Sequence, residues 1–162
     1  MNITDIDPLE FRKAKFPISD TFLKRWSPRA MNNKPVGQEV MQTLFEAARW
    51  APSAGNSQPW RFFYALRETD GFKTLYRLLD EGNQSWCHRA GALIVVCSDT
   101  LTTSGKSLGT HALTTGMAVQ NLLLQASLMG LVGHGMAGFD ADRARTDLNL
   151  PDRYHDNCKV AI

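Results

Sequence analysis

Residues 25–31, with the sequence RWSPRAM, carry two arginines and a serine at alternating positions. Pro28 disfavours a helical backbone at Ser27 and favours an extended one. Because side chains two residues apart point the same way in an extended segment, Arg25, Ser27 and Arg29 are expected to share one side. A guanidinium grips phosphate oxygens with a planar fork of donors, so this side suits an anion. A solvated surface turn remains the commoner interpretation of such spacing alone.

Residues 51–60, with the sequence APSAGNSQPW, combine small residues with amide side chains. Alanine, serine and glycine let a flat ligand approach the backbone closely. Asn56 and Gln58 supply both donors and acceptors, while Pro52 and Pro59 stiffen the two ends. The same residues are ordinary turn formers. Taken alone, the segment is better explained as a plain connection between a helix and a strand.

Residues 133–138, with the sequence GHGMAG, contain three glycines that bring backbone N–H groups close to any ligand. The spacing is GxGxxG, but a long helical pattern precedes it and a short polar helix follows. A Rossmann dinucleotide site needs a strand before the glycines and a longer helix after them. A tight loop after a strand is therefore the alternative to a ligand-binding role.

Other chemistry finds little support in this sequence. No HxxxH or HExxH spacing relates the four histidines, and no GxSxG motif is present. The three cysteines form no CxxC pair, which fits neither a disulfide framework nor a zinc site. We therefore expect reduced thiols in a cytoplasmic protein, with no metal and no catalytic side chain.

Composition sets further bounds on function. The 162 residues are enough for about one domain with a sizeable core. A formal charge of +2 is too small to indicate nucleic acid or a membrane surface as a partner. The N-terminus lacks the apolar stretch of a signal peptide. Polar residues interrupt the most apolar segment, residues 112–131, which argues against a membrane span.

Hydrophobic periodicity predicts the elements that must position these segments. In the first part of the chain we expect a helix over 37–51 ended by Pro52, a strand over 60–66, a short helix over 71–79 and a buried strand over 92–97. A long helix over 110–129 should follow, buried on more than one face and ended by Gly130. The remaining elements are a short strand and loop over 131–139, a polar helix over 140–148, and a strand from 159. This order is compatible with a layered α/β fold or with an α+β fold whose helices cover one sheet.

Taken together and in this order, the segments resemble the nitroreductase family of FMN-dependent oxidoreductases. The resemblance is carried by RWSPRAM, by EAARWAPSAGNSQPWRFF, and by GMAVQNLLLQASLMGLVG followed by GMAGFD. It extends from about residue 25 to the C-terminal end, and PSAGNSQPW is its most specific part. It implies an α+β fold with a central, mainly antiparallel sheet flanked by helices, and a long buried central helix.

The resemblance also implies a bound FMN. Arg25, Ser27 and Arg29 would hold its phosphate and ribityl chain, and Asn83 would lie at the pyrimidine side of the flavin. The segment that would set its backbone against the ring consists of Gly135, Met136, Ala137 and Gly138.

Members of this family form intertwined homodimers with FMN at the interface. Pro52, Ser53 and Asn56 would therefore reach the flavin of the partner chain. The implied reaction transfers a hydride from NAD(P)H to FMN and then electrons to a small acceptor in a ping-pong cycle. Nitroaromatics, quinones and enals are acceptors by analogy. The cofactor supplies this chemistry, which agrees with the lack of a nucleophile in the sequence.

Family members usually continue past the strand seen here as KVAI, with a glycine-proline turn and a basic residue that helps hold the phosphate. We therefore expect residues 1–162 to form a single nitroreductase-like domain without the usual C-terminal extension. Two alternatives are a flavin-binding protein without turnover and a scaffold that has lost the cofactor. The intact Arg25, Ser27, Arg29, Ser53 and Asn56 argue against the scaffold.

Overall fold

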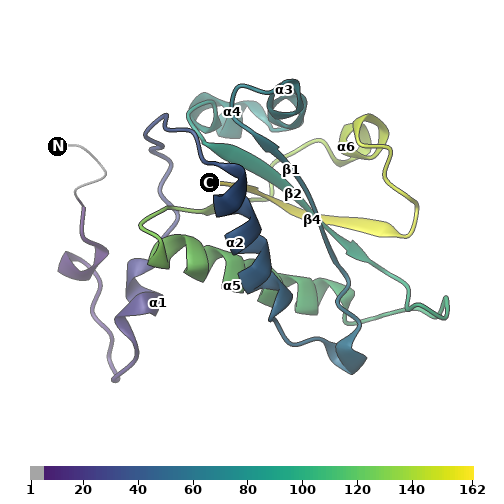
Figure 1. Cartoon of the computed structure of the whole chain (residues 1–162), viewed down its shortest axis with the longest axis horizontal. Coiled ribbons are helices and arrows are strands. Elements are labelled where there is room, and N and C mark those ends of the chain that lie inside the picture. The colour runs from purple at the N-terminus through teal and green to yellow at the C-terminus, as the bar shows by residue number, and fades with distance from the viewer. Residues whose placement is uncertain (1–5) are drawn as a thin grey trace.

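The computed structural model describes residues 6–162. Within this range a sheet of antiparallel strands in the order β1-β2-β4-β3 has helices on both faces, an α+β arrangement (Figure 1). The strands are β1 (Trp60–Leu66), β2 (Ala92–Asp99), β3 (His134–Met136) and β4 (Tyr154–Ala161). The helices are α1 (Asp20–Lys24), α2 (Gln38–Arg49), α3 (Asp70–Arg77), α4 (Glu81–Cys87), α5 (His111–Leu128) and α6 (Ala141–Asp147), with short 3-10 turns at Pro8–Glu10 and Ala54–Asn56.

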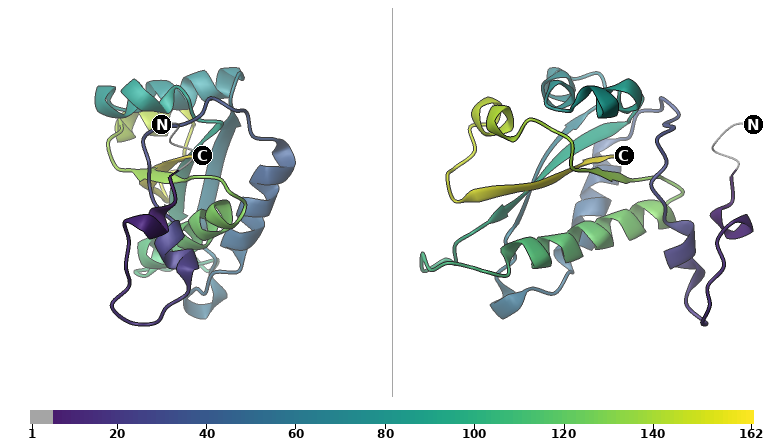
Figure 2. Two further views of the ribbon diagram at one scale, coloured as in Figure 1. Left: turned by 90° about the vertical axis from the view of Figure 1, so that its left-hand side faces the viewer. Right: turned by 180° about the vertical axis from the view of Figure 1, so that it is seen from behind.

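Strand β2 is buried along its whole length, because both faces of the sheet are covered. Alternate side chains of a strand point to opposite faces. Ile94 and Val96 belong to the core formed with α2 and α5, whereas Leu93 and Val95 belong to the core formed with α3 and α4. Figure 2 shows the two helical layers from the side and from behind. The predicted buried strand is confirmed.

Helix α2 follows the predicted amphipathic pattern. Met41, Leu44 and Ala48 lie on its buried face, and the helix ends at Arg49, shortly before Pro52. Because proline lacks a backbone donor and clashes with the preceding turn, a helix cannot continue through it without a kink.

Helix α5 confirms the predicted long central helix. Ala118, Leu122 and Ala126 are buried along it. It ends where predicted, because Gly130 has a φ of +71° and the Leu131 amide donates to the carbonyl of Ala126 at 2.9 Å.

Helix α4 and strand β4 differ from the sequence expectation. Helix α4 was not predicted, although Asp80 caps it by accepting a hydrogen bond from the Asn83 amide at 2.7 Å. Strand β4 begins at Tyr154 rather than at Lys159, because its polar first half pairs with the end of β2 across a register shift at Cys97. Periodicity detects neither element, since one is short and the other is polar where it starts.

Lys159, on β4, carries a charged side chain that is buried in the protein interior. It is 2% exposed, and its ammonium lies 4.2 Å from the centroid of the Phe139 ring. Its Nζ has no hydrogen-bond partner among residues 6–162. Burial lowers the pKa of Lys159 from 10.5 to about 8, against the opposing effect of Asp156 and Asp140.

We predict that Lys159→Met stabilises the protein at pH 7. The fall in pKa from 10.5 to about 8 corresponds to about 3 kcal/mol at 1.36 kcal/mol per pH unit. Because the unfolded state holds this proton more tightly, the free energy of unfolding of the unmodified protein should rise between pH 8 and pH 10.5. The Met variant should lack that rise. Urea unfolding across this pH range measures it, and equal pH dependence in both proteins would contradict the prediction.

Candidate functional site

The RWSPRAM segment leaves α1 in an extended conformation, as the sequence predicts. Arg25 has a φ of −69° and a ψ of 115°, and its Nη1 donates to the Ser27 hydroxyl at 3.3 Å. Arg12 donates to the Arg25 carbonyl at 2.8 Å. Burial and the charge of Arg12 lower the pKa of Arg25. A bound anion would relieve this repulsion between two guanidinium groups.

A cavity of about 500 Å³ lies between this segment and the end of α5. Among residues 6–162, its cationic lining residues are Lys24, Arg25, Lys34 and Arg89, and its acidic lining residue is Asp7. Ser27 and Arg29 do not line it and are exposed. The surroundings of Arg25 are therefore predominantly positive, which again favours an anionic ligand.

His134 connects the RWSPRAM segment to β3. Its Nδ1 lies 3.1 Å from the Pro28 carbonyl oxygen, and its ring packs against Trp86 at a centroid distance of 4.7 Å. The histidine and the tryptophan pack against each other here. This contact sets the arginine-containing segment beside the start of residues 135–138.

Asn83 and Gly138, which are 55 positions apart, are hydrogen-bonded. The Asn83 Nδ2 donates to the Gly138 carbonyl at 3.0 Å, and the Asp80 amide donates to the same oxygen at 3.2 Å. A Cβ at Gly138 would overlap the Asp80 carboxylate. Asp80 was missed by the sequence analysis, although an aspartate before a short polar run is an N-cap signal.

The backbone of residues 135–137 lies at the protein surface with little side chain above it. Gly135 and Ala137 are exposed, and a Cβ at Gly135 would meet no atom within 4 Å. Met136 is 4% exposed and points inward, with its sulfur 3.3 Å from that of Cys87. A flat ligand could therefore approach this backbone closely, but Met136 could offer it only main-chain groups.

The loop over residues 52–58 is held by its own side chains. Ser53 Oγ accepts from the Gln58 amide at 3.0 Å, and Gln58 Nε2 donates to Asn56 Oδ1 at 2.8 Å. Gly55, Asn56 and Gln58 have φ values of 57°, 52° and 43°. Left-handed backbone at residues other than glycine is strained and is concentrated at functional sites.

This loop lies at the other end of α5 from the RWSPRAM segment (Figure 1). Pro52 borders a groove formed with Ala112, Leu113 and Gly116 at the start of the helix. Arg25 and Pro28 lie near Ser127 and Gly130 at its end. Because α5 has 18 residues, its ends are about 27 Å apart. The predicted site residues thus form two separate groups in one chain.

The three thiols offer no reactive nucleophile. Burial raises the pKa of Cys87 to about 12 and that of Cys158 to about 11. Burial and a hydrogen bond to Asp156 also raise the pKa of Cys97. Thiolate is the nucleophilic form, so these cysteines are inert at neutral pH. Within residues 6–162, no group of three or more His, Cys, Asp or Glu side chains gathers as metal ligands do, and no helix has the length and apolar character to cross a membrane.

Comparison with known proteins identifies the group to which this fold belongs. The sequence model of the Nitroreductase family matches residues 23–81 and 65–162. The chain belongs to the nitroreductase family. A solved structure described as an oxidoreductase containing FMN is 40% identical, covers 93% of this chain and 78% of its own, and superimposes with a TM-score of 0.89.

Two relatives show how much of this nitroreductase-family chain matches other proteins in sequence. An uncharacterised 15.4 kDa protein of Mycolicibacterium smegmatis is 38% identical over 94 residues, 56% of this chain and 60% of that protein. A Rhodopseudomonas palustris protein, provisionally named NADH dehydrogenase/NAD(P)H nitroreductase, is 26% identical over 142 residues, 76% of this chain and 72% of that protein. The match therefore spans less than two thirds of the Mycolicibacterium smegmatis protein and slightly more than two thirds of the Rhodopseudomonas palustris protein.

We predict that Gly138→Ala destabilises this nitroreductase-family protein. The added methyl group would displace the Asp80 carboxylate, which caps α4, and would disturb the Asn83–Gly138 hydrogen bond. Loss of a cap or of such a bond costs about 1–2 kcal/mol. Urea unfolding measures the change. Gly135→Ala is the matched control, because its methyl group would meet open space; equal effects of the two changes would refute the prediction.

Proposed function

We propose that this chain works as an FMN-dependent oxidoreductase. Electrons pass from NAD(P)H to a small organic acceptor, such as a nitroaromatic or a quinone, in a ping-pong cycle. The observation that carries the proposal is the match to the oxidoreductase containing FMN, at 40% identity over 93% of this chain. The name of the Rhodopseudomonas palustris relative supports a reduced nicotinamide as the electron donor.

In this proposal Arg25, Ser27 and Arg29 bind the FMN phosphate and ribityl chain. Two observations support the fit. Arg25 is half-buried beside the like charge of Arg12, so a phosphate would offset an unfavourable interaction. Arg25 and Ser27 also lie side by side, so that a guanidinium and a hydroxyl face one ligand. Charge-assisted hydrogen bonds of this kind are among the strongest in proteins.

The flavin ring would lie against the backbone of residues 135–138, close to Asn83. The open space at Gly135 fits the approach of a flat ring. The hydrogen bond from Asn83 Nδ2 to the Gly138 carbonyl fixes which way the amide points. The Asn83 side-chain oxygen is then an acceptor for an N–H group of the pyrimidine ring.

Pro52, Ser53 and Asn56 would complete the flavin site of a second copy of the chain. They lie about 27 Å along α5 from the arginine-containing group, which is too far for both groups to hold the same end of one cofactor. Helix α5 also exposes a row of apolar side chains that includes Leu113 and Leu128, each 65% exposed. A second copy would cover this row, and a homodimer is the commonest symmetric way to do so.

When bound, FMN supplies the hydride and electron transfer. The residues of the chain bind and orient it. Asn83 fixes the position of the pyrimidine side, and residues 135–138 exclude water from one face of the ring. No side chain is required to move a proton, which agrees with the protonated thiols of Cys87 and Cys158.

We predict that the purified protein is yellow, or becomes yellow after incubation with FMN, and oxidises NADH or NADPH when a quinone or nitroaromatic is supplied. Absorption in the flavin bands and the loss of nicotinamide absorbance measure the two properties. A protein that binds FMN without any such turnover would be a flavin-binding protein. A colourless protein that takes up no FMN would exclude both functions.

We predict that Arg29→Ala and Asn56→Ala each weaken FMN binding by about tenfold to a hundredfold, the effect of losing a hydrogen bond to a charged or oriented group. In a mixed dimer of the two variants, one site carries both changes and the other carries neither. Titration with FMN should therefore recover one tight site per mixed dimer.

The matched control is a mixed dimer of Arg29→Ala and Ser27→Ala. Both changes lie in the same proposed group, so every site of that dimer carries one of them and no tight site returns. Recovery in both mixtures, or in neither, would disprove a site shared between chains.

A further inference from the structure

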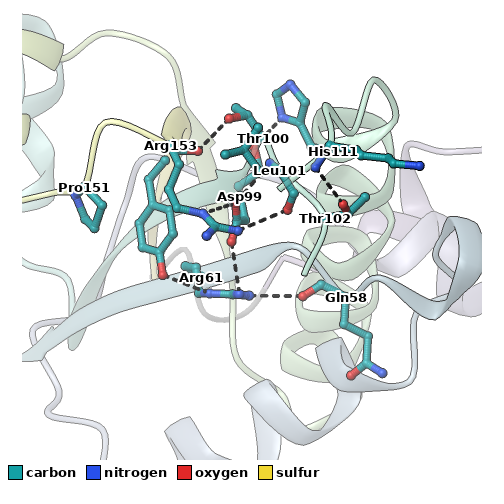
Figure 3. Close-up of polar contacts among 12 residues, drawn as sticks. Gln58, Arg61, Asp99, Thr100, Leu101, Thr102, His111, Pro151 and Arg153 are labelled. Atoms are coloured by element: carbon teal, nitrogen blue, oxygen red, sulfur yellow. Dashed lines mark hydrogen bonds and ion pairs between the residues drawn. The ribbon is translucent and has the colours of Figure 1, made fainter. Parts of the chain in front are cut away.

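Asp99, at the end of β2, is a buried carboxylate held by two arginines. Its side chain is 8% exposed. Its Oδ1 accepts from Arg153 Nε at 2.7 Å and from the Leu101 amide at 3.1 Å, and its Oδ2 lies 3.5 Å from Arg61 Nη2 (Figure 3). Side chains from β1, from β2 and from the residue that precedes β4 therefore meet at one negative charge.

This carboxylate is ionised at neutral pH. Burial acts to raise the pKa of Asp99, but the hydrogen bond from Arg153 and the neighbouring positive charges hold that pKa below its usual value. A buried charge that loses its partners is strongly destabilising, so each arginine is kept where it is. Asp99 therefore helps to position Arg61, together with the Tyr154 hydroxyl, which accepts from Arg61 Nε at 3.2 Å.

Arg61 extends from this charge to the loop over residues 52–58. Its Nη1 donates to the Gln58 carbonyl at 3.0 Å and to the Trp60 carbonyl at 2.9 Å. The Asp99 amide also donates to the Pro59 carbonyl at 2.9 Å. Asp99 therefore contacts the end of the loop in two ways: its side chain does so through Arg61, and its backbone amide bonds directly to Pro59.

Gln58 connects Arg61 to the rest of the loop through hydrogen bonds. It is a non-glycine residue with a φ of 43°, a conformation that persists only when its surroundings enforce it. Its amide donates to Ser53 Oγ and its side chain donates to Asn56 Oδ1. The residue fixed by Arg61 is therefore the one that fixes Ser53 and Asn56.

We propose that Asp99 is a positioning residue for the cofactor site, acting through Arg61 and Gln58 to hold Ser53 and Asn56 where the flavin of the partner needs them. The inference rests on the proposed function for the role of Ser53 and Asn56. Its structural part, that the charge of Asp99 fixes the loop, can be measured without FMN. Arg153 serves in this arrangement as the second counter-charge that keeps Asp99 ionised.

The first test is hydrogen exchange of the purified protein without FMN, comparing Asp99→Asn with the unmodified protein. Asparagine keeps the size of the side chain and removes its charge. Exchange at the amides of Asn56, Ser57 and Gln58 should rise by about tenfold or more, while the amides of α5 keep their protection. Asp70→Asn is the matched control, because Asp70 is an exposed partner of Lys73 on α3.

Arg61→Lys is a second variant in case Asp99→Asn folds poorly. It keeps the positive charge beside Asp99 but loses the planar fork that reaches two carbonyls. The same local rise in exchange is expected. Unchanged exchange in the loop, or a rise spread evenly over the whole chain, would overturn the proposal.

The second test is FMN affinity in a double-mutant cycle. Asp99→Asn should weaken binding by about tenfold in the unmodified protein, but should weaken it no further in a protein that already carries both Ser53→Ala and Asn56→Ala. Additive losses would mean that Asp99 does not act through the loop. If the unmodified protein binds no FMN, the proposed function fails, whereas the exchange experiment still decides whether Asp99 fixes the loop.

Discussion

Burial of β2 between two apolar layers is the constraint on which the rest of the structure depends. Every residue of Ala92–Asp99 is buried, and alternate side chains enter the cores on opposite faces. Complete burial of a valine, leucine or isoleucine side chain contributes about 1.5–3 kcal/mol, and Leu93, Ile94, Val95 and Val96 of this strand are each at most 2% exposed. Both helical layers, and with them both groups of candidate site residues, are positioned by packing against it.

The length of α5 determines how a cofactor site can be assembled. The helix separates the RWSPRAM segment from the loop over residues 52–58, and its contacts with β2 leave no freedom to bring them together. In the proposed function, one chain therefore supplies two incomplete halves of the cofactor site. Pairing of two copies along the exposed row of α5 is the simplest arrangement that would join them, and it would also cover apolar side chains that a single chain exposes.

Two buried charges in this sheet, Asp99 and Lys159, have different effects on the fold. Asp99 has two arginines and a backbone amide, so its charge organises the residues around it. Lys159 has an aromatic ring and more distant carboxylates but no hydrogen-bond partner among the described residues, so its burial costs stability. The contrast agrees with the general rule that buried charges stabilise a fold only when their partners are close and well oriented.

The sequence by itself determined the elements that carry a strong local signal. The amphipathic spacing in α2, the long apolar run of α5 and the β-branched run of β2 each bury a continuous face, and Pro52 and Gly130 end helices for steric reasons that act within a few residues. The family resemblance also rests on local signals, because RWSPRAM and PSAGNSQPW are each an unbroken run of residues.

Only the tertiary structure decided which of these segments meet. The hydrogen bond between Asn83 and Gly138, the contact of His134 with Pro28, and the convergence of Arg61 and Arg153 on Asp99 join residues far apart in the chain. Which residues meet in these contacts depends on the register of the sheet and on the packing of the helices, and a local sequence pattern contains neither. The same reason explains why α4 and the polar start of β4 were missed: each is stabilised by what it packs or pairs with, and not by its own sequence.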